Sequence, residues 1–349
     1  MNTEAKLTPV REAHRFNQAA LAKYLIAELD GFCEPFSVQQ FEGGQSNPTF
    51  LLDCGAHKYV LRKKPPGKLL PSAHQVDREY RVMKALEPTD VPVPRMYLLC
   101  KDETVIGTMF FVMEYIEGRL FSNVTLPGLP TGERRAIYFE MIRVLAALHS
   151  VDYDALGLSD FGKPGNYFAR QIGRWSKQYV SAKTDQIASM ENLMNYLPQN
   201  VPSDDITCLV HGDYRLENML FHPTEPKILA LLDWELSTLG HPLGDLAYSC
   251  GSYHFTTADN PSLQGICGPE SGIPTESEFV EEYCRRTDRA GIPNWNFYMA
   301  FAFFRLASIC QGVYKRGLMG TASSTQALER GRLTGAISDL AWSFIKNGS

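Results

Sequence analysis

The stretch LVHGDYRLENMLF, at residues 209–221, constrains this chain more than any other, because closely spaced polar residues interrupt two apolar strands. Segments 206–210 and 227–232 have the composition of such strands. Carboxylate and amide oxygens are ligands of magnesium, which keeps waters and phosphate oxygens as its other ligands. Phosphoryl transfer needs neutralised phosphate charge and a base near the attacking hydroxyl. The pattern predicts this chemistry and offers four candidate residues: His211, Asp213, Asn218 and Asp233.

The spacing H-G-D-x-x-x-x-N, with D-W-E fifteen residues beyond the Asn, resembles the catalytic core of the aminoglycoside phosphotransferase and choline kinase-like family. It is similar in spacing to the catalytic loop of protein kinases. The resemblance implies that Asp213 is the catalytic base and that Asn218 and Asp233 bind magnesium. It further implies that Arg215 contacts the transferred phosphate and that His211 holds the geometry of the loop. A surface loop with an incidental His and Asp is the alternative, and the joint spacing argues against it.

An ion pair is expected near the N-terminus. Strand alternation in KYVLRKK puts Arg62 on the same face as Val60, and Glu79 shares a helix face with apolar residues. A carboxylate on an apolar face needs a partner, which Arg62 would supply. The pair resembles the strand-lysine and helix-glutamate pair that orients ATP phosphates in kinases, although Arg stands where protein kinases have Lys. An ordinary ion pair between two elements is the alternative.

Two further segments are candidates for nucleotide binding. The resemblance implies that the turn containing Gly43, Gly44 and Ser46 covers the phosphates, whereas a plain hairpin turn is the alternative. The strand around FFVMEY resembles a kinase hinge, at which the backbone of Glu114 and Ile116 would meet adenine. Core packing of that strand is equally compatible with its apolar residues.

The order of expected elements predicts an α+β fold of the bilobal protein-kinase-like kind. Residues 1–115 would form a small antiparallel-sheet lobe that binds the nucleotide. Residues 116–349 would form a larger, mostly helical lobe with the catalytic loop and the acceptor site. Strands are expected at 36–41, 48–53, 58–62, 95–100, 109–115, 206–210 and 227–232. Helices are expected at 11–29, 73–86, 134–148, 166–180, 276–290, 294–316 and 323–345.

The bulk composition excludes several classes of protein. The net charge of −5 and the pI near 5.9 argue against a general nucleic-acid binder. The eight Cys form no C-x-x-C pair, so no zinc or thioredoxin-type site is indicated. The N-terminal residues show no apolar secretion signal, and we expect a cytoplasmic location. The apolar stretch 295–313 contains Arg305 and Gln311, which predicts a buried helix instead of a membrane span.

Asp245 and Arg305 are polar residues in apolar surroundings. Asp245, in HPLGDLAY, should be hydrogen-bonded, and the resemblance implies that it braces the catalytic loop. Arg305 either is paired structurally or lines the acceptor cavity. Residues 300–349 contain six basic and two acidic side chains, a balance that favours an anionic acceptor.

The segments GGQSNPTF, VLRKKPPG and LLDWELSTLGHPLGDLAY also resemble the kinase-like domain found fused to acyl-CoA dehydrogenases. This resemblance implies an ATP- and magnesium-dependent kinase that acts on a hydroxyl of an acyl-CoA or related acid. The alternatives are an aminoglycoside, choline or homoserine-type kinase, or a pseudokinase that binds nucleotide without turnover. No A-P-E segment follows Asp233, which argues against a protein kinase.

Overall fold

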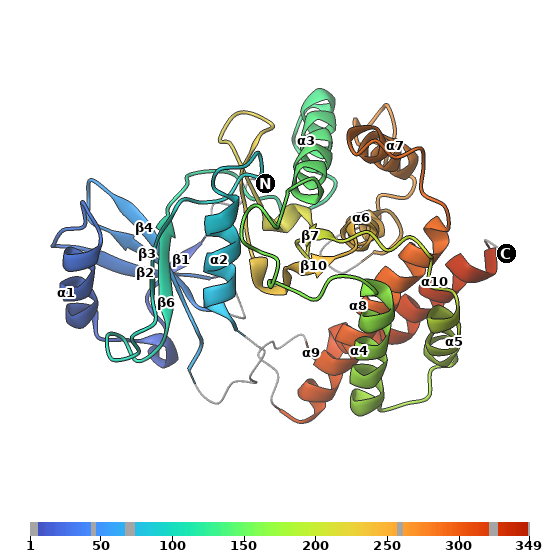
Figure 1. Ribbon diagram of the computed structural model, residues 1–349, viewed down its shortest axis with the longest axis horizontal. Helices are drawn as coiled ribbons and strands as arrows, with labels where there is room; N and C mark the ends of the chain where they lie inside the picture. Colours follow the sequence, from blue (N-terminus) through green and yellow to red (C-terminus); the bar gives the residue numbers. More distant parts are fainter. Residues whose placement is uncertain (1–5, 43–46, 67–73, 257–260, 321–326, 348–349) are drawn as a thin grey trace. The chain divides into compact units, whose positions relative to one another are not determined.

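The chain forms two compact units in a computed structural model that describes residues 6–42, 47–66, 74–256, 261–320 and 327–347. The first unit comprises residues 1–128, 154–158 and 216–237, and the second comprises residues 129–153, 159–215 and 238–349. A sheet dominates the first unit and helices dominate the second (Figure 1). The expected α+β class is therefore observed.

The first unit contains a sheet of six strands in the order β1-β2-β3-β4-β6-β5, and all neighbours are antiparallel. The strands are β1 (Leu7–Thr8), β2 (Ser37–Phe41), β3 (Thr49–Asp53), β4 (Lys58–Lys63), β5 (Met96–Cys100) and β6 (Phe110–Glu114). All five strands expected in this region are confirmed within two residues, because runs of alternating apolar residues separate clear turn sequences. The two-residue strand β1 is too short to leave such a pattern.

Two helices cover opposite faces of this sheet, as Figure 1 shows. Leu61 of β4 pairs with Val112 of β6, and both belong to the apolar cluster of α1 (Gln18–Glu28). Arg62, the next residue along β4, faces α2 (Val76–Leu86). The helix expected over 11–29 is shorter than predicted, because the side chain of Asn17 accepts the amide hydrogen of Ala20 and starts a new helix there.

The hairpin of β8 (Met219–Phe221) and β9 (Ile228–Leu231) belongs to the first unit. The boundary expected from the sequence, between residues 115 and 116, instead assigns this hairpin to the second lobe. Backbone hydrogen bonds explain the difference. The amide of Arg119 donates to the carbonyl of Phe221 at 2.8 Å, and the amide of Phe221 donates to the carbonyl of Arg119 at 2.9 Å. The amide of Leu231 donates to the carbonyl of Pro92 at 2.9 Å. The hairpin is thus attached to segments that precede the second unit in sequence.

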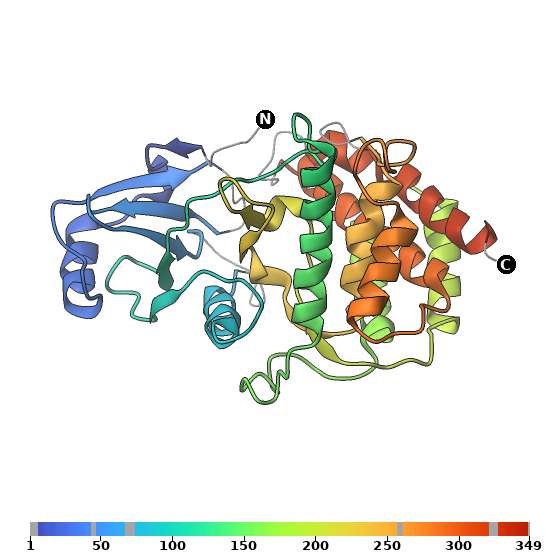
Figure 2. The same cartoon turned by 90° about the horizontal axis from the view of Figure 1, so that it is seen from above.

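The second unit consists mainly of helices that pack side by side (Figures 1 and 2). They are α3 (Thr131–His149), α4 (Tyr167–Ala182), α5 (Ala188–Tyr196), α6 (Pro242–Cys250), α7 (Glu276–Arg286), α8 (Trp295–Leu318), α9 (Ala327–Arg332) and α10 (Thr334–Asn347). A short pair of strands, β7 (Cys208–Val210) and β10 (Thr238–Gly240), completes it. The single helix expected over 323–345 is wrong, because a turn at Leu333 separates α9 from α10.

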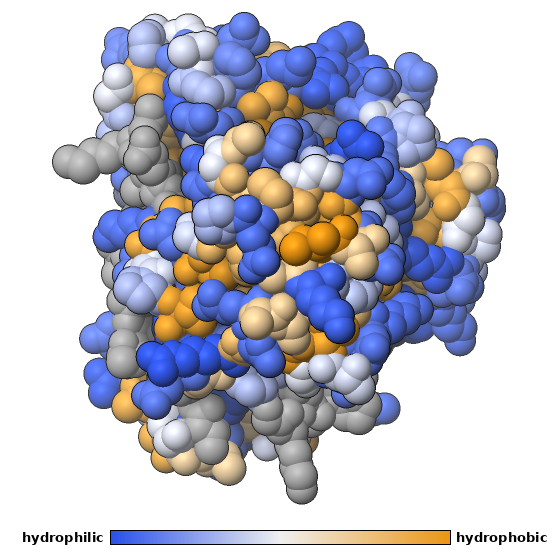
Figure 3. Space-filling model, turned by 90° about the vertical axis from the view of Figure 1, so that its left-hand side faces the viewer, coloured by the Kyte–Doolittle hydropathy of each residue, from blue (hydrophilic) through white to orange (hydrophobic). Residues whose placement is uncertain are grey.

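Among the described residues, α8 alone has the length and apolar composition of a membrane-crossing helix, yet 72% of its most apolar window is buried in the protein. The buried helix expected at 295–313 is therefore confirmed. On the face drawn in Figure 3, hydrophobic side chains lie scattered among hydrophilic ones. Such scattering is ordinary for a protein surface.

Gly118 tests the attachment of the β8–β9 hairpin. A Cβ atom there would meet the carbonyl oxygen of Phe221 and the side chain of Leu220 below van der Waals separation. We expect Gly118→Ala to destabilise the first unit by about 1–3 kcal/mol, as overpacking does. Gly132→Ala is the control, since beyond its chain neighbours and the backbone of its own helix no heavy atom lies within 4 Å of its Cβ position. Equal melting temperatures for the two variants would contradict this expectation.

Candidate active site

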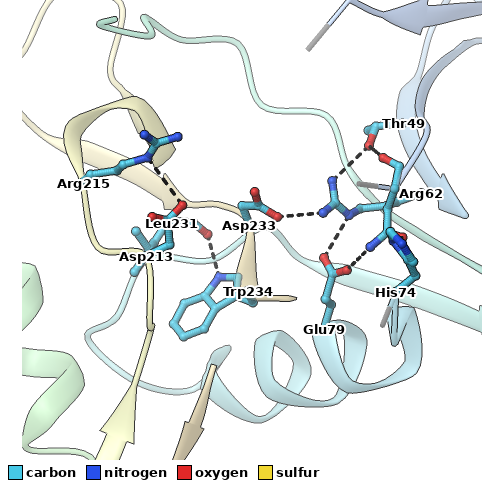
Figure 4. A network of polar contacts seen from close by, with 10 residues as sticks. Thr49, Arg62, His74, Glu79, Asp213, Arg215, Leu231, Asp233 and Trp234 are labelled. Atoms are coloured by element: carbon cyan, nitrogen blue, oxygen red, sulfur yellow. Dashed lines mark hydrogen bonds and ion pairs between the residues drawn. The ribbon is translucent and has the colours of Figure 1, made fainter. Parts of the chain in front are cut away.

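The polar cluster of the first unit is centred on the guanidinium of Arg62. Its Nε lies 2.9 Å from Oε2 of Glu79, and its Nη2 donates to Oδ1 of Asp233 at 2.8 Å (Figure 4). Its Nη1 donates to the hydroxyl of Thr49 at 3.2 Å. The Arg62–Glu79 pair expected from the sequence is confirmed. One planar fork therefore serves three partners that come from a strand, a helix and a loop.

Asn47 is a second contact of Glu79. Its Nδ2 donates to Oε1 of Glu79 at 2.7 Å, and its Oδ1 lies 3.1 Å from Nδ1 of His74. Asn47 is fully buried, so these bonds satisfy an amide that has no access to water. Gly43, Gly44 and Ser46, which precede it, lie outside the described residues.

The ionisation of the Arg62–Glu79 pair is governed by burial. Burial raises the pKa of Glu79 to about 7, even though Arg62 and Asn47 favour its charged form. Burial also opposes the charge of Arg62, but Glu79 and Asp233 together hold the pKa of Arg62 above its usual value. Arg62 is therefore charged at physiological pH, and Glu79 binds a proton more strongly than an ordinary glutamate does.

Asn218 and Asp233 lie at the same end of the β8–β9 hairpin. Met219 pairs with Leu231, and the amide of Leu232 donates to the carbonyl of Asn218 at 2.8 Å. Asp233 has a φ of 64°, a left-handed conformation that is uncommon outside Gly, Asn and Asp. Asn218 is thus hydrogen-bonded through its backbone to Leu232, the residue directly before Asp233, so the hairpin carries an amide and a carboxylate residue at one end. This oxygen donor set fits a magnesium ion that also takes phosphate oxygens.

In the second unit, the loop after β7 is held by the carboxylate of Asp245 on α6. Its Oδ2 accepts the amide hydrogen of His211 at 2.6 Å, and its Oδ1 accepts that of Gly212 at 2.9 Å. Gly212 has a φ of 83°, which a glycine adopts without strain. The Nδ1 of His211 accepts the amide hydrogen of Asp213 at 3.2 Å. The backbone of H-G-D is therefore fixed at three consecutive amides.

His149, at the end of α3, is a further contact of the Asp245 carboxylate. Its Nε2 lies 3.5 Å from Oδ2 of Asp245, and its Nδ1 lies 2.7 Å from the hydroxyl of Tyr283. Burial alone would raise the pKa of Asp245, but hydrogen bonding with His149 and the proximity of His149 and His211 hold it below its usual value. A buried carboxylate is thus kept ionised by the groups that it orients.

The side chain of Asp213 is partly exposed and has contacts on both oxygens. The hydroxyl of Tyr248 donates to Oδ1 at 2.5 Å, and Nε of Arg215 lies 3.4 Å from Oδ2. Figure 4 also draws the contact of Asp213 with Arg215, whose side chain is 49% exposed. The structure therefore places Arg215 beside the candidate base.

Arg305 of α8 lies beneath the same loop, with 7% of its surface exposed. Its Nη2 donates to the carbonyl of Gly212 at 2.6 Å. Its guanidinium lies 5.6 Å from the ring centre of Trp175 and 5.5 Å from that of Tyr248. These contacts support the loop. The alternative, contact with an acceptor, stays a prediction.

The hinge residues have mixed surroundings. The amide of Glu114 donates to the carbonyl of Arg95 at 2.9 Å, so this amide is already engaged within the sheet. Ile116 follows β6 and is half-buried. Their contact with adenine stays a prediction.

Sequence reasoning missed Asn47, His149 and Tyr248. Two of them carry a local signal in retrospect. Asn47 ends the Gly-rich turn, and Tyr248 lies one helical turn after Asp245 on the same face of α6. The role of His149 depends on tertiary packing and leaves no such signal.

A sheet-bearing unit with a strand-to-helix ion pair, and a helical unit with an H-G-D loop, define a kinase-like phosphotransferase fold. The model of the phosphotransferase enzyme family matches residues 37–286. The chain therefore belongs to this family.

Solved structures agree with this assignment. A protein from Ralstonia eutropha, described as a candidate aminoglycoside phosphotransferase, is 49% identical to this chain with a TM-score of 0.87. The match covers 95% of this chain and 99% of that one. A thermostable mutant of aminoglycoside phosphotransferase APH(4)-Ia, solved with AMP-PNP and hygromycin B, is 17% identical with a TM-score of 0.61. That match covers 93% of this chain and 98% of the other, and it shows a likeness of fold.

Acyl-CoA dehydrogenase family member 10 of Mus musculus is 48% identical to this chain over 340 residues. The matched part is 96% of this chain and 32% of that relative, so the chain spans about a third of the relative's length. The resemblance to the kinase-like domain of such proteins is confirmed.

Replacing Arg305 tests its role beneath the loop. Arg305→Met removes the bond to Gly212 and the contacts with two aromatic rings, so we expect a loss of about 1–3 kcal/mol in stability. ATP affinity should not change. The control is Arg174→Met, because Arg174 lies over the same Trp175 ring but is exposed. A melting temperature equal to that of the control, with a raised acceptor KM, would instead indicate contact with the acceptor.

Proposed function

We propose that this chain, with magnesium as its cofactor, transfers the γ-phosphate of ATP to a hydroxyl group of a small molecule. The observation that carries the proposal is the position of Arg62 between Glu79 and Asp233. A guanidinium fork suits phosphate oxygens, and the adjacent carboxylate is of the kind that magnesium binds. The nucleotide analogue in the APH(4)-Ia structure supports ATP as the donor.

Asp213 and Asn218 are five positions apart in one motif, which supports roles for both in the same reaction. Arg62 would hold phosphate oxygens, and Asn218 and Asp233 would hold magnesium. The ion, when bound, supplies positive charge that neutralises the phosphates. Asp213 would take the proton of the acceptor hydroxyl, and Arg215 beside it would contact the transferred group.

The acceptor that we propose is a hydroxyl of an acyl-CoA or a related acid. Two observations support an anionic acceptor. The mouse relative is named as an acyl-CoA dehydrogenase family member, and such a name links the domain to acyl-CoA chemistry. Residues 300–349 have six basic and two acidic side chains. An aminoglycoside is a polycation and would favour the opposite charge balance.

Asp233→Ala tests the metal assignment. A lone Asn218 cannot supply enough ligands, so the variant should lose the part of ATP binding that depends on magnesium. Calorimetric titration of ATP with and without magnesium measures this difference directly. Asp102→Ala is the matched control, because Asp102 is an exposed aspartate of the same unit that bonds locally to Thr104. Unchanged magnesium dependence in Asp233→Ala would show that the assignment is wrong.

The acceptor is tested by measuring ADP release over a panel of hydroxy acids, hydroxyacyl-CoA esters, amino alcohols and aminoglycosides. We expect the fastest release with an anionic hydroxyl compound and poor release with aminoglycosides. Asp213→Asn should lower this turnover by about 100-fold or more, because the carboxylate base is lost while ATP binding remains. Efficient aminoglycoside phosphorylation would overturn the proposed acceptor. Tight ATP binding without transfer to any acceptor would favour a pseudokinase.

A further inference from the structure

Asn47, directly before β3, makes contacts through three of its polar atoms. Its Nδ2 donates to Oε1 of Glu79 at 2.7 Å, and its Oδ1 lies 3.1 Å from Nδ1 of His74. Its backbone carbonyl accepts the hydroxyl hydrogen of Thr49 at 3.1 Å. Asn47 is fully buried, so these contacts replace the water that an exposed asparagine would bind. The side chain and the backbone of one residue are therefore both engaged in the interior of the first unit.

Two of these contacts lead to the guanidinium of Arg62. Glu79, which the side chain of Asn47 holds, has its Oε2 2.9 Å from Nε of Arg62. Thr49, which bonds the carbonyl of Asn47, accepts a hydrogen bond from Nη1 of Arg62 at 3.2 Å. Figure 4 shows Thr49 and Glu79 beside Arg62. Asn47, Glu79, Arg62 and Thr49 thus form a closed ring of contacts, and all four belong to the first unit.

The direction of the bond between Asn47 and Glu79 follows from the chemistry of the ring. An ionised carboxylate only accepts hydrogen bonds, and a guanidinium only donates them. Asn47 therefore has to present its Nδ2 to Glu79, which leaves its Oδ1 facing His74. Burial raises the pKa of Glu79 to about 7, and the amide of Asn47 is one of the groups that oppose this rise. Asn47 thus supports the form of Glu79 that pairs with Arg62.

We propose that Asn47 is a positioning residue, which sets the plane of the Arg62 guanidinium for the phosphate oxygens of ATP by holding Glu79 and Thr49. This inference rests on the proposed function, in which Arg62 binds those oxygens. A guanidinium presents its donors in a rigid planar fork, so a rotation of the plane moves all of its N–H groups together. An ammonium group has three donors that rotate freely and needs less orientation. The ring supplies the orientation that an arginine at this position requires.

Exchanging the two side-chain types tests the bond between Asn47 and Glu79. Asn47→Asp places an acceptor against the Glu79 carboxylate, and Glu79→Gln places an amide donor against Asn47 or Arg62. Each single variant contains one mismatched pair, so we expect the Kd for ATP with magnesium to rise by about 10- to 100-fold. In the double variant the new glutamine can donate to the new aspartate, while its carbonyl oxygen accepts from Arg62. We expect that Kd to return to within about threefold of the wild-type value.

Calorimetric titration measures each Kd, and the melting temperature of each variant is recorded beside it. Asn123→Asp is the matched control in the same unit and should leave the Kd unchanged. The Oδ1 of Asn123 accepts the amide and hydroxyl hydrogens of Thr125, and an aspartate keeps both bonds. Additive losses of ATP affinity in the double variant would overturn the proposal. Recovery of its melting temperature without recovery of the Kd would do the same, because it would show a structural role alone.

Thr49→Val tests the other side of the ring without placing a charge in the interior. It removes only the hydroxyl that joins Arg62 to the carbonyl of Asn47, and it should raise the Kd for ATP by about 3- to 10-fold. An unchanged Kd would contradict the proposal even if the variants of Asn47 do not fold. ATP binding by the wild type without transfer to any acceptor would sink the proposed function alone, because the positioning role is measured by binding.

Discussion

The hydrogen bonds of the buried Asp245 carboxylate are the interactions on which the H-G-D loop of the second unit depends. The carboxylate accepts the amide hydrogens of His211 and Gly212, and it is itself held by His149. Two backbone amides in a loop without regular structure would otherwise be unsatisfied in the interior, which is costly. Because the carboxylate satisfies both at once, the loop can leave β7 without regular structure, and the side chain of the next residue, Asp213, bonds Tyr248. A single acidic residue therefore permits an irregular loop inside a packed helical unit.

The first unit uses a different solution, in which one cation holds two carboxylates. Arg62 contacts Glu79 and Asp233, and a Lys in its place would have a compact ammonium group instead of a planar fork. The fork contacts both carboxylates at once, which a single ammonium group would do with less defined geometry. Burial raises the pKa of Glu79, and the charge of Arg62 opposes that rise.

Much of this arrangement could be predicted from the sequence, because its parts are local. The strands of the sheet follow from alternating apolar residues, and the Arg62–Glu79 pair follows from strand and helix periodicity with the cost of an unpaired buried charge. The parts that escaped prediction depend on tertiary contacts. The short strand β8 has no periodic signal, and the break at Leu333 interrupts an otherwise continuous helical pattern. The bond from Tyr248 to Asp213 joins residues whose proximity only the folded unit creates.

The hairpin of β8 and β9 has a consequence for how the chain is synthesised and folded. Residues 216–237 belong to the first unit, but nearly ninety residues separate them from its main N-terminal segment, residues 1–128. During translation, this unit cannot be completed until residue 237 has left the ribosome, by which time most of α3 to α5 is already available to fold. Closing so long a loop has an entropic cost that local contacts do not repay, so completion of the unit should be a late, slow event. The first unit therefore cannot be obtained as a simple N-terminal fragment, since residues 216–237 would be missing from it.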